Sequence, residues 1–144
     1  MIGQSCERAE FREQGFGPQF LTVASGPSAR RIAYLRREPA RAKPQPAGLV
    51  WLGGVKPHMF GAKASHLDRY AERTGRAFLR FDYSGHGLSE GDFKTGTIGK
   101  WLEESLAAIQ ELTEGPQILI GSSMGGWLAL LVARELHARA RAAG

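Results

Sequence analysis

A cluster of glycines around one serine constrains the fold of this chain more than any other feature of its sequence. Residues 119–133 read LIGSSMGGWLALLVA, an apolar strand pattern that leads into a helix pattern with no loop between them. Gly121 and Gly125 lie two positions either side of Ser123, and Gly126 comes next. Glycine is favoured where the backbone is strained or where another segment comes close. The segment therefore predicts a sharp strand-to-helix turn with Ser123 at its tip.

The same residues carry a catalytic pattern. GSSMG at 121–125 fits G-x-S-x-G, which by itself occurs often by chance. A strand directly before this pattern and a helix directly after it are the setting of a nucleophile elbow, a turn that projects the serine hydroxyl outward. Side chains at Gly121 and Gly125 would collide with each other and with the neighbouring strand, and we expect Gly126 to let the helix lie close to the sheet. The alternative is a glycine-rich turn that only packs or binds a phosphate.

The rest of the chain alternates strand and helix signals. Residues 20–25 and 30–37 alternate apolar and polar side chains around a Gly-Pro-Ser turn and predict a hairpin. Three short apolar runs predict strands buried on both faces, and three periodic stretches predict helices. The strand runs begin at residues 49, 76 and 116; the helices are expected at 62–75 with Gly75 as C-cap, at 97–115 with Thr97 as N-cap, and from 123 to about 139.

This order of elements predicts an α/β fold, with a mostly parallel sheet covered by helices and an antiparallel hairpin at its N-terminal edge. Ligands of such sheets bind at the carboxyl ends of the strands. The segments GGVKPH, YSGHG and GSSMGG all fall at that edge. We therefore expect the functional site there.

Two backbone amides are candidates for stabilising a negative charge beside Ser123. The helix after Ser123 directs its N-terminus, with unpaired N–H groups and the positive end of its dipole, at the reacting atoms. The N–H of Met124 is then the first candidate donor. A second is expected from the glycine-rich loop after the strand that begins at residue 49, where we assign the N–H of Val55.

Three segments together resemble the α/β-hydrolase superfamily: residues 50–64, residues 76–93 with 97–104, and residues 118–131. The combination of DYSGHGLS at 82–89 with GSSMGGWL at 121–128 is far more specific than G-x-S-x-G alone. The resemblance runs from about residue 21 to 131. It points to the branch of serine esterases and thioesterases related to the mitochondrial palmitoyl-protein thioesterase and acyl-glucuronide esterase, with bacterial relatives.

The resemblance implies a function and a set of roles. The substrate is a small carboxylic ester or thioester, the nucleophile is Ser123, and the reaction passes through an acyl-Ser123 intermediate. The amides of Val55 and Met124 form the oxyanion hole. Asp82 and His86 look like members of a catalytic triad in composition, but the resemblance places them in structural roles, with both side chains bonded to backbone in their loop. No cofactor and no metal are implied.

The partners of Ser123 are missing from the expected positions. Proton transfer from the serine needs an imidazole held by a carboxylate, and in this fold the acid and the histidine follow the serine in the chain. The acid and the histidine after Ser123 are Glu135 and His137, and His137 would lie about 20 Å along the helix. His58 and His86 lie near the right edge of the sheet, but neither occupies the position of the base in the family.

We therefore expect residues 19–144 to be the N-terminal part of an α/β-hydrolase domain, truncated after the helix that follows the serine, with residues 1–18 as a flexible lead-in. Such a chain would be incomplete or weakly active. The alternatives are a natural short protein that uses His58 or His86, and a non-catalytic remnant. A sheet that stops after its last predicted strand exposes an edge, so self-association is expected.

Composition argues against other classes of function. The net charge is +5, but the basic residues are scattered rather than gathered in a patch, so nucleic-acid binding is not expected. No apolar run is long enough to span a membrane. The histidines do not show the spacing of metal ligands. A single cysteine, Cys6, and the lack of a signal-peptide pattern predict a cytoplasmic protein.

The sequence leaves two further interpretations open. A dinucleotide- or phosphate-binding module is the alternative function, because Gly85, Gly87 and later glycines follow a strand, although no helix pattern begins there. Tyr83 could line the pocket for the acyl group or could simply be packed in the core. The three tryptophans fall in apolar runs and are all predicted to be core residues: Trp51, Trp101 and Trp127.

Overall fold

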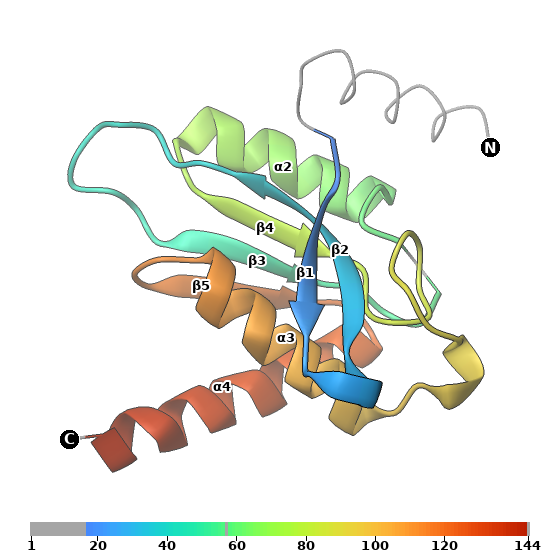
Figure 1. The fold of residues 1–144 in the computed structure, drawn as a ribbon. Coiled ribbons are helices and arrows are strands. Elements are labelled where there is room, and N and C mark those ends of the chain that lie inside the picture. The colour runs from blue at the N-terminus through green and yellow to red at the C-terminus, as the bar shows by residue number, and fades with distance from the viewer. Residues whose placement is uncertain (1–16, 57, 144) are drawn as a thin grey trace.

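The computed structural model describes residues 17–56 and 58–143, which form a mixed five-stranded sheet with helices on both faces (Figure 1). The strand order is β1-β2-β4-β3-β5. The strands are β1 (Gln19–Val23), β2 (Arg30–Arg37), β3 (Gly48–Leu52), β4 (Phe78–Phe81) and β5 (Gln117–Gly121). The predicted fold class is confirmed. The expected lead-in at residues 1–18 lies almost wholly outside the described residues.

The sheet divides into an antiparallel and a parallel half. β1 and β2 form the predicted hairpin around the short 3₁₀ helix η1 (Gly26–Ser28), and β2 also pairs antiparallel with β4. β3 pairs in parallel with both β4 and β5. Every residue of β3 and β4 is buried, as predicted for strands covered on both faces.

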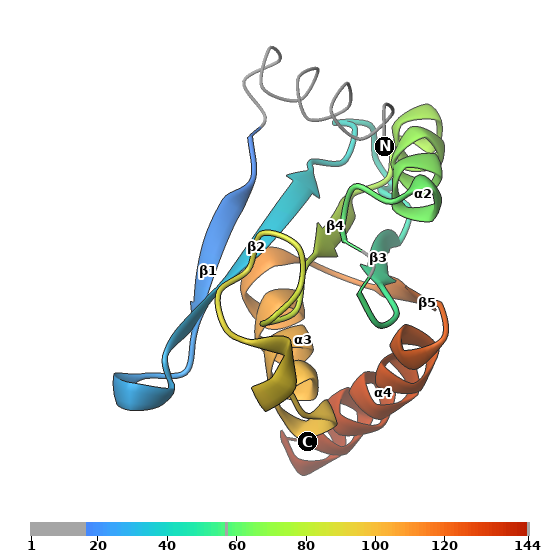
Figure 2. The same cartoon turned by 90° about the vertical axis from the view of Figure 1, so that its right-hand side faces the viewer.

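Helices cover the two faces unequally (Figure 2). One face carries α2 (Ala62–Thr74), which packs on Trp51 and Phe78 in a small cluster. The other face carries α3 (Ile98–Leu112) and α4 (Met124–Ala143), whose apolar sides enclose the main core with Val50, Leu52 and Leu79. None of the helices in the described part of the chain is long and apolar enough to cross a membrane.

Two of the predicted helix ends are confirmed. The Thr97 hydroxyl accepts a hydrogen bond from the N–H of Lys100 at the start of α3, and Gly75 ends α2 in the left-handed conformation with φ +68°. α3 stops at Leu112 rather than at Gly115, because Thr113 turns to extended backbone and its N–H and hydroxyl both donate to the carbonyl of Ile109.

Two burial predictions at the β5 end are wrong. β5 is an edge strand with partly exposed side chains, and Ile118 is 46% exposed. Trp127 is 54% exposed, because it lies on the outer side of α4, a helix that buries only Gly125, Leu128 and Val132. Trp51 and Trp101 are buried as predicted.

Candidate active site

The backbone bends sharply at Ser123 in the turn after β5. β5 ends at Gly121, α4 begins at Met124, and Ser123 between them has φ +57°. That left-handed conformation is strained for a residue with a side chain. The Ser123 carbonyl accepts the N–H of Gly126 at 2.9 Å, so the helix starts directly after the bend, and the Ser123 side chain is exposed.

Two of the three glycines are required by close contacts. A Cβ at Gly121 would run into the backbone of Gly125, and a Cβ at Gly125 would run into the carbonyl oxygens of Leu52 and Gly53 in the neighbouring strand. The steric prediction is confirmed at both. It is wrong for Gly126, where a Cβ would meet its nearest atom at 3.8 Å, an ordinary contact. Gly126 lies on the less crowded side of the first turn of α4.

The two amides assigned to the oxyanion hole lie on the elements expected. Met124 is the first residue of α4, and Val55 lies in the loop after β3 and lines the same cavity as Ser123. No described residue accepts a hydrogen bond from the N–H of Val55 or of Met124. Free donors at the start of a 20-residue helix favour a negative charge beside them.

A cavity of about 470 Å³ opens beside Ser123, and α2 forms its other wall. Lys63, near the start of α2, donates from Nζ to the Ser122 hydroxyl at 2.9 Å. Sequence reasoning missed this contact, because 59 residues separate the two side chains and no spacing indicates that they meet. The lining residues are Trp51, Gly54, Val55, His58, Gly61, Ala62, Lys63, Ala64, Ser122 and Ser123.

Asp82 follows β4 but is held away from this cavity by its own hydrogen bonds. It is 2% exposed, and its carboxylate accepts the N–H of Met59 at 2.6 Å and of Leu88 at 3.0 Å. Burial raises the pKa of Asp82 above its ordinary value, and the two backbone donors oppose that shift. The expected structural role, with backbone as partner, is confirmed.

His86 and Tyr83 are also structural. His86 is 4% exposed, its Nδ1 lies 3.1 Å from the carbonyl oxygen of Ser84, and its ring meets Tyr83, Phe93 and Trp101 at centroid distances of 5.2 to 5.5 Å. The Tyr83 hydroxyl donates to the carbonyl of Gly53 at 3.0 Å. Tyr83 is therefore packed in the core, where it fixes the loop that carries Val55.

His58 lines the cavity but is not arranged as a base. Its Nδ1 accepts the N–H of Phe60 at 3.2 Å, which places the proton of the neutral ring on Nε2. With Nδ1 taken by a backbone donor, no described carboxylate is hydrogen-bonded to this ring, and the arrangement of an imidazole held by a carboxylate is not present at His58. His86 does not line the cavity.

The glycines after β4 do not form a phosphate site. The N–H of Ser84 donates to the buried carboxylate of Glu104 at 2.9 Å, and the N–H of Gly85 donates to the carbonyl of Glu90 at 2.9 Å. The element that follows is the short 3₁₀ helix η2 (Phe93–Thr95) rather than an α-helix. The amides of Ser84 and Gly85 are therefore already bonded, one to α3 and one within the loop, and are not available to a phosphate.

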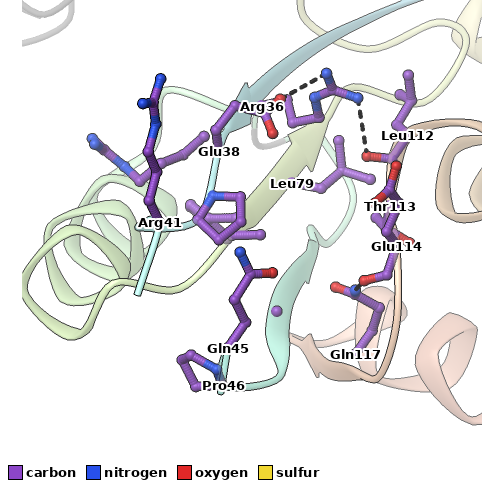
Figure 3. Close-up of a pocket in the computed structure, with 15 residues that line it drawn as sticks. Arg36, Glu38, Arg41, Gln45, Pro46, Leu79, Leu112, Thr113, Glu114 and Gln117 are labelled. Carbon is purple, nitrogen blue, oxygen red and sulfur yellow. Dashed lines mark hydrogen bonds and ion pairs between the residues drawn. The ribbon is translucent and has the colours of Figure 1, made fainter. Parts of the chain in front are cut away.

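A second cavity, of about 350 Å³, lies at the opposite end of the parallel strands (Figure 3). One of its three arginines, Arg36, forms an ion pair with Glu38 at 2.7 Å and donates to the carbonyl of Leu112, and Gln117 donates to the carbonyl of Glu114. These three side chains are therefore paired with one another or with backbone. The cavity is on the side away from the carboxyl ends of β3 and β5, where ligands bind in such sheets.

Residues 47–144 match the alpha/beta hydrolase family. The palmitoyl-protein thioesterase ABHD10, mitochondrial, of Bos taurus is 40% identical over 108 residues, which is 75% of this chain and 34% of the relative. The protein of the same name in Mus musculus is 43% identical over 90 residues, which is 62% of this chain and 30% of the relative. The chain thus spans about a third of the length of these relatives.

Solved structures agree with these matches. A crystal structure of an Agrobacterium vitis S4 protein superposes with a TM-score of 0.80 at 46% identity, over 85% of this chain and 46% of the other. Mouse alpha/beta hydrolase domain-containing protein 10 superposes with a TM-score of 0.71 at 38% identity, over 81% and 44%. The expectation of a cytoplasmic protein is wrong by these comparisons, because the curated relatives are named mitochondrial.

Proposed function

Because the chain belongs to the alpha/beta hydrolase family, we propose that it is a serine hydrolase of carboxylic esters or thioesters that acts through Ser123. One observation carries this proposal: Ser123 lies directly before α4, its backbone is strained at φ +57°, and its hydroxyl is exposed. The similarity to relatives named palmitoyl-protein thioesterase supports the same class of substrate.

In the proposed reaction the Ser123 oxygen attacks the carbonyl carbon of the substrate. The amides of Val55 and Met124 donate to the oxygen that becomes negative, and the bend at Ser123 holds the attacking atom beside them. The leaving alcohol or thiol takes the proton, and water then hydrolyses the acyl-Ser123 ester to the carboxylic acid. The glycines Gly121 and Gly125 serve the reaction by allowing the bend.

We further propose that residues 1–144 alone turn over substrate slowly. The structure describes four histidines: His58 and His86 are held by other contacts, His66 lies on α2 and does not line the cavity that contains Ser123, and His137 lies on the exposed outer part of α4. Without a base, the remaining acceleration comes from the oxyanion donors and from substrate binding.

The decisive experiment is covalent labelling of the purified chain with a fluorophosphonate, in which the Ser123 oxygen displaces fluoride from phosphorus. Peptide mass spectrometry is expected to place the adduct on Ser123, and Ser123→Ala is expected to abolish it. Ser28→Ala, a serine exposed in η1, is the matched control and keeps the label. An adduct on another residue, or unchanged labelling of the alanine variant, would overturn the proposal.

Hydrolysis of p-nitrophenyl butyrate tests the second part. Catalytic groups that act as a unit are strongly non-additive, so in a chain without its base Ser123→Ala is expected to cost about tenfold rather than the far larger factor of a complete triad. Rapid turnover that disappears with Ser123→Ala would contradict the slow-turnover prediction and would require a base within residues 1–144.

We also propose that copies of this chain associate through β5 and α4. β5 is the last strand of the sheet, and its neighbourhood exposes Ile118 (46%), Trp127 (54%) and Leu130 (74%). An unpaired strand beside exposed apolar side chains is a surface that favours association. Sedimentation velocity should show concentration-dependent association, which Trp127→Gln with Leu130→Gln should reduce. A strictly monomeric chain at high concentration contradicts this proposal.

A further inference from the structure

The cavity beside Ser123 continues into a second hollow along α2. The second hollow is about 420 Å³ and is lined by Trp51, Ala62, Lys63, His66 and Leu67. It shares Trp51, Ala62 and Lys63 with the cavity that contains Ser123. The two are therefore parts of one groove, which we call the α2 groove. Its floor is apolar and it leads away from the reacting serine, a shape that suits an aliphatic chain.

The charge along the α2 groove has one sign. Of the described residues that line its two parts, one is a lysine, two are histidines and none is acidic: Lys63, His58 and His66. Lys63 contacts the neutral hydroxyl of Ser122 and forms none of the described ion pairs. It is also the second residue of α2, where its charge adds to the positive end of the helix dipole instead of offsetting it.

We propose that the α2 groove selects half-esters and half-thioesters of dicarboxylic acids, with the free carboxylate of the acyl chain bound by the Lys63 ammonium. This inference rests on the proposed function of Ser123. The methylene chain lies on Trp51, and the carboxylate pairs with a cation that has no carboxylate partner among the described residues. Hydrolysis breaks the ester or thioester bond, water supplies the new acid oxygen, and the products are the dicarboxylic acid and the alcohol or thiol.

The expected preference for the anionic substrate follows from the position of Lys63, which lines the groove but is still in contact with solvent. Exposed ion pairs contribute little, and a pair in a groove that excludes part of the water contributes more. We therefore expect the anionic substrate to react about three- to tenfold faster than a neutral analogue at low ionic strength. Added salt should reduce this preference, because salt screens charges that face solvent.

The kinetic test compares mono-p-nitrophenyl adipate with its neutral methyl ester on the same protein. The readout is the ratio of kcat/KM for the two substrates, from the release of p-nitrophenolate. Lys63→Met should bring this ratio to about one and Lys63→Glu should bring it below one. Lys100→Met is the matched control, because Lys100 lies on α3 and donates to the carbonyl of Thr95 in η2, and it should leave the ratio unchanged. A wild-type ratio of one, or a ratio that survives Lys63→Glu, overturns the inference.

A third ester, with the charge on the departing phenol instead, separates the two ends of the substrate. The protein could prefer 4-(hexanoyloxy)benzoate to p-nitrophenyl hexanoate, with a preference that depends on Lys63. That result would place the anion on the leaving-group side of the carbonyl and would overturn the inference as stated. No such preference is expected.

A binding experiment separates this inference from the chemistry of Ser123. N-butyladipamic acid and N-butylhexanamide are amides that the protein is not expected to cleave, and ligand-observed NMR gives their affinities for the Ser123→Ala variant. Tighter binding of the acid, lost in Ser123→Ala with Lys63→Met, supports the groove even if no ester is hydrolysed. Equal binding of both amides by the Ser123→Ala variant, together with labelling of the wild-type protein at Ser123, overturns the groove and leaves the proposed function in place.

Discussion

Two glycine-containing turns lie at the carboxyl end of this sheet, and their polar side chains differ in burial. In the turn after β4, the carboxylate of Asp82 and the ring of His86 are buried and bonded to backbone. In the turn after β5, the hydroxyl of Ser123 is exposed and its backbone is strained. The first turn uses catalytic residue types for stability, and the second gives up stability to present one reactive atom.

The comparison teaches that residue type alone does not mark a site. A buried donor or acceptor that is left unpaired costs free energy, so the β4 turn depends on the backbone partners of the Asp82 carboxylate and of the His86 Nδ1, whereas the His86 Nε2 is buried with no described hydrogen-bond partner. The β5 turn has the reverse arrangement, with free amides beside a cavity. Satisfaction of hydrogen bonds separates the scaffold from the candidate active site.

Asp82→Ala should have the largest effect on stability. The change leaves the buried N–H groups of Met59 and Leu88 without an acceptor, and each unsatisfied group costs about 1–3 kcal/mol, so we expect a loss of about 4 kcal/mol. Urea unfolding measures it. The control is Asp92→Ala, which removes an exposed carboxylate that caps η2 and should cost about 1 kcal/mol or less. Equal costs for the two variants would contradict the scaffold role of Asp82.

Gly125→Ala should cost about 3 kcal/mol, because the added methyl meets backbone carbonyls of β3 that cannot move aside without distorting the sheet. Gly126→Ala is the matched control one residue along the same helix. Its methyl meets only ordinary contacts, and alanine is the better helix former, so this variant should be stabilised by up to about 1 kcal/mol. Thermal unfolding of the two variants side by side would show the difference, and similar melting temperatures would refute the contact argument.

Ser123→Gly should raise the free energy of unfolding by about 1 kcal/mol while abolishing fluorophosphonate labelling. Glycine adopts φ +57° without the steric cost that serine bears. Ser122→Gly is the control, because Ser122 has no positive φ, and it should be destabilised by the greater chain entropy of glycine in the unfolded state. A destabilised Ser123→Gly variant would show that the bend stores no strain.

The smallest expected effect is a dependence of stability on pH that belongs to Asp82. Its pKa in the folded protein is raised by burial, so the folded state holds this proton more tightly than the unfolded chain does. The contribution is therefore fully present below the ordinary pKa of 3.8 and is lost as the pH rises through the folded value. The free energy of unfolding of the wild type and of Asp82→Asn is measured from pH 3.5 upward. As the pH rises, the value for the wild type should fall relative to the value for the variant. A difference that grows in the opposite direction would contradict the raised pKa.

Much of the fold was predictable because it depends on neighbours in the chain. The apolar periodicity predicted the strands and helices, and the side chain of Thr97 and the backbone freedom of Gly75 predicted two helix ends. The bend at Ser123 was predictable for the same reason, since Gly121 and Gly125 report the space around it. These features are local to a few residues, with the exception of Gly125, whose Cβ would meet the distant carbonyls of Leu52 and Gly53.

The errors concern positions whose environment is set by distant segments. Trp127 has the composition of a core residue, but the place of β5 at the edge of the sheet leaves the outer side of α4 uncovered. Gly126 directly follows Gly125 in the sequence, yet only Gly125 faces the end of β3. Apolar character in sequence does not say whether another element will cover it.

By itself, the sequence determined an α/β sheet with a strained serine between a strand and a helix, because periodicity and glycine placement act over short distances. Only the tertiary structure decided that the Asp82 carboxylate accepts the N–H of Met59 from a distant segment and that Lys63 meets Ser122 beside the reacting serine. Those contacts join residues that the chain brings together only after the sheet has formed. Their energies depend on burial and direction, which no spacing in the sequence records.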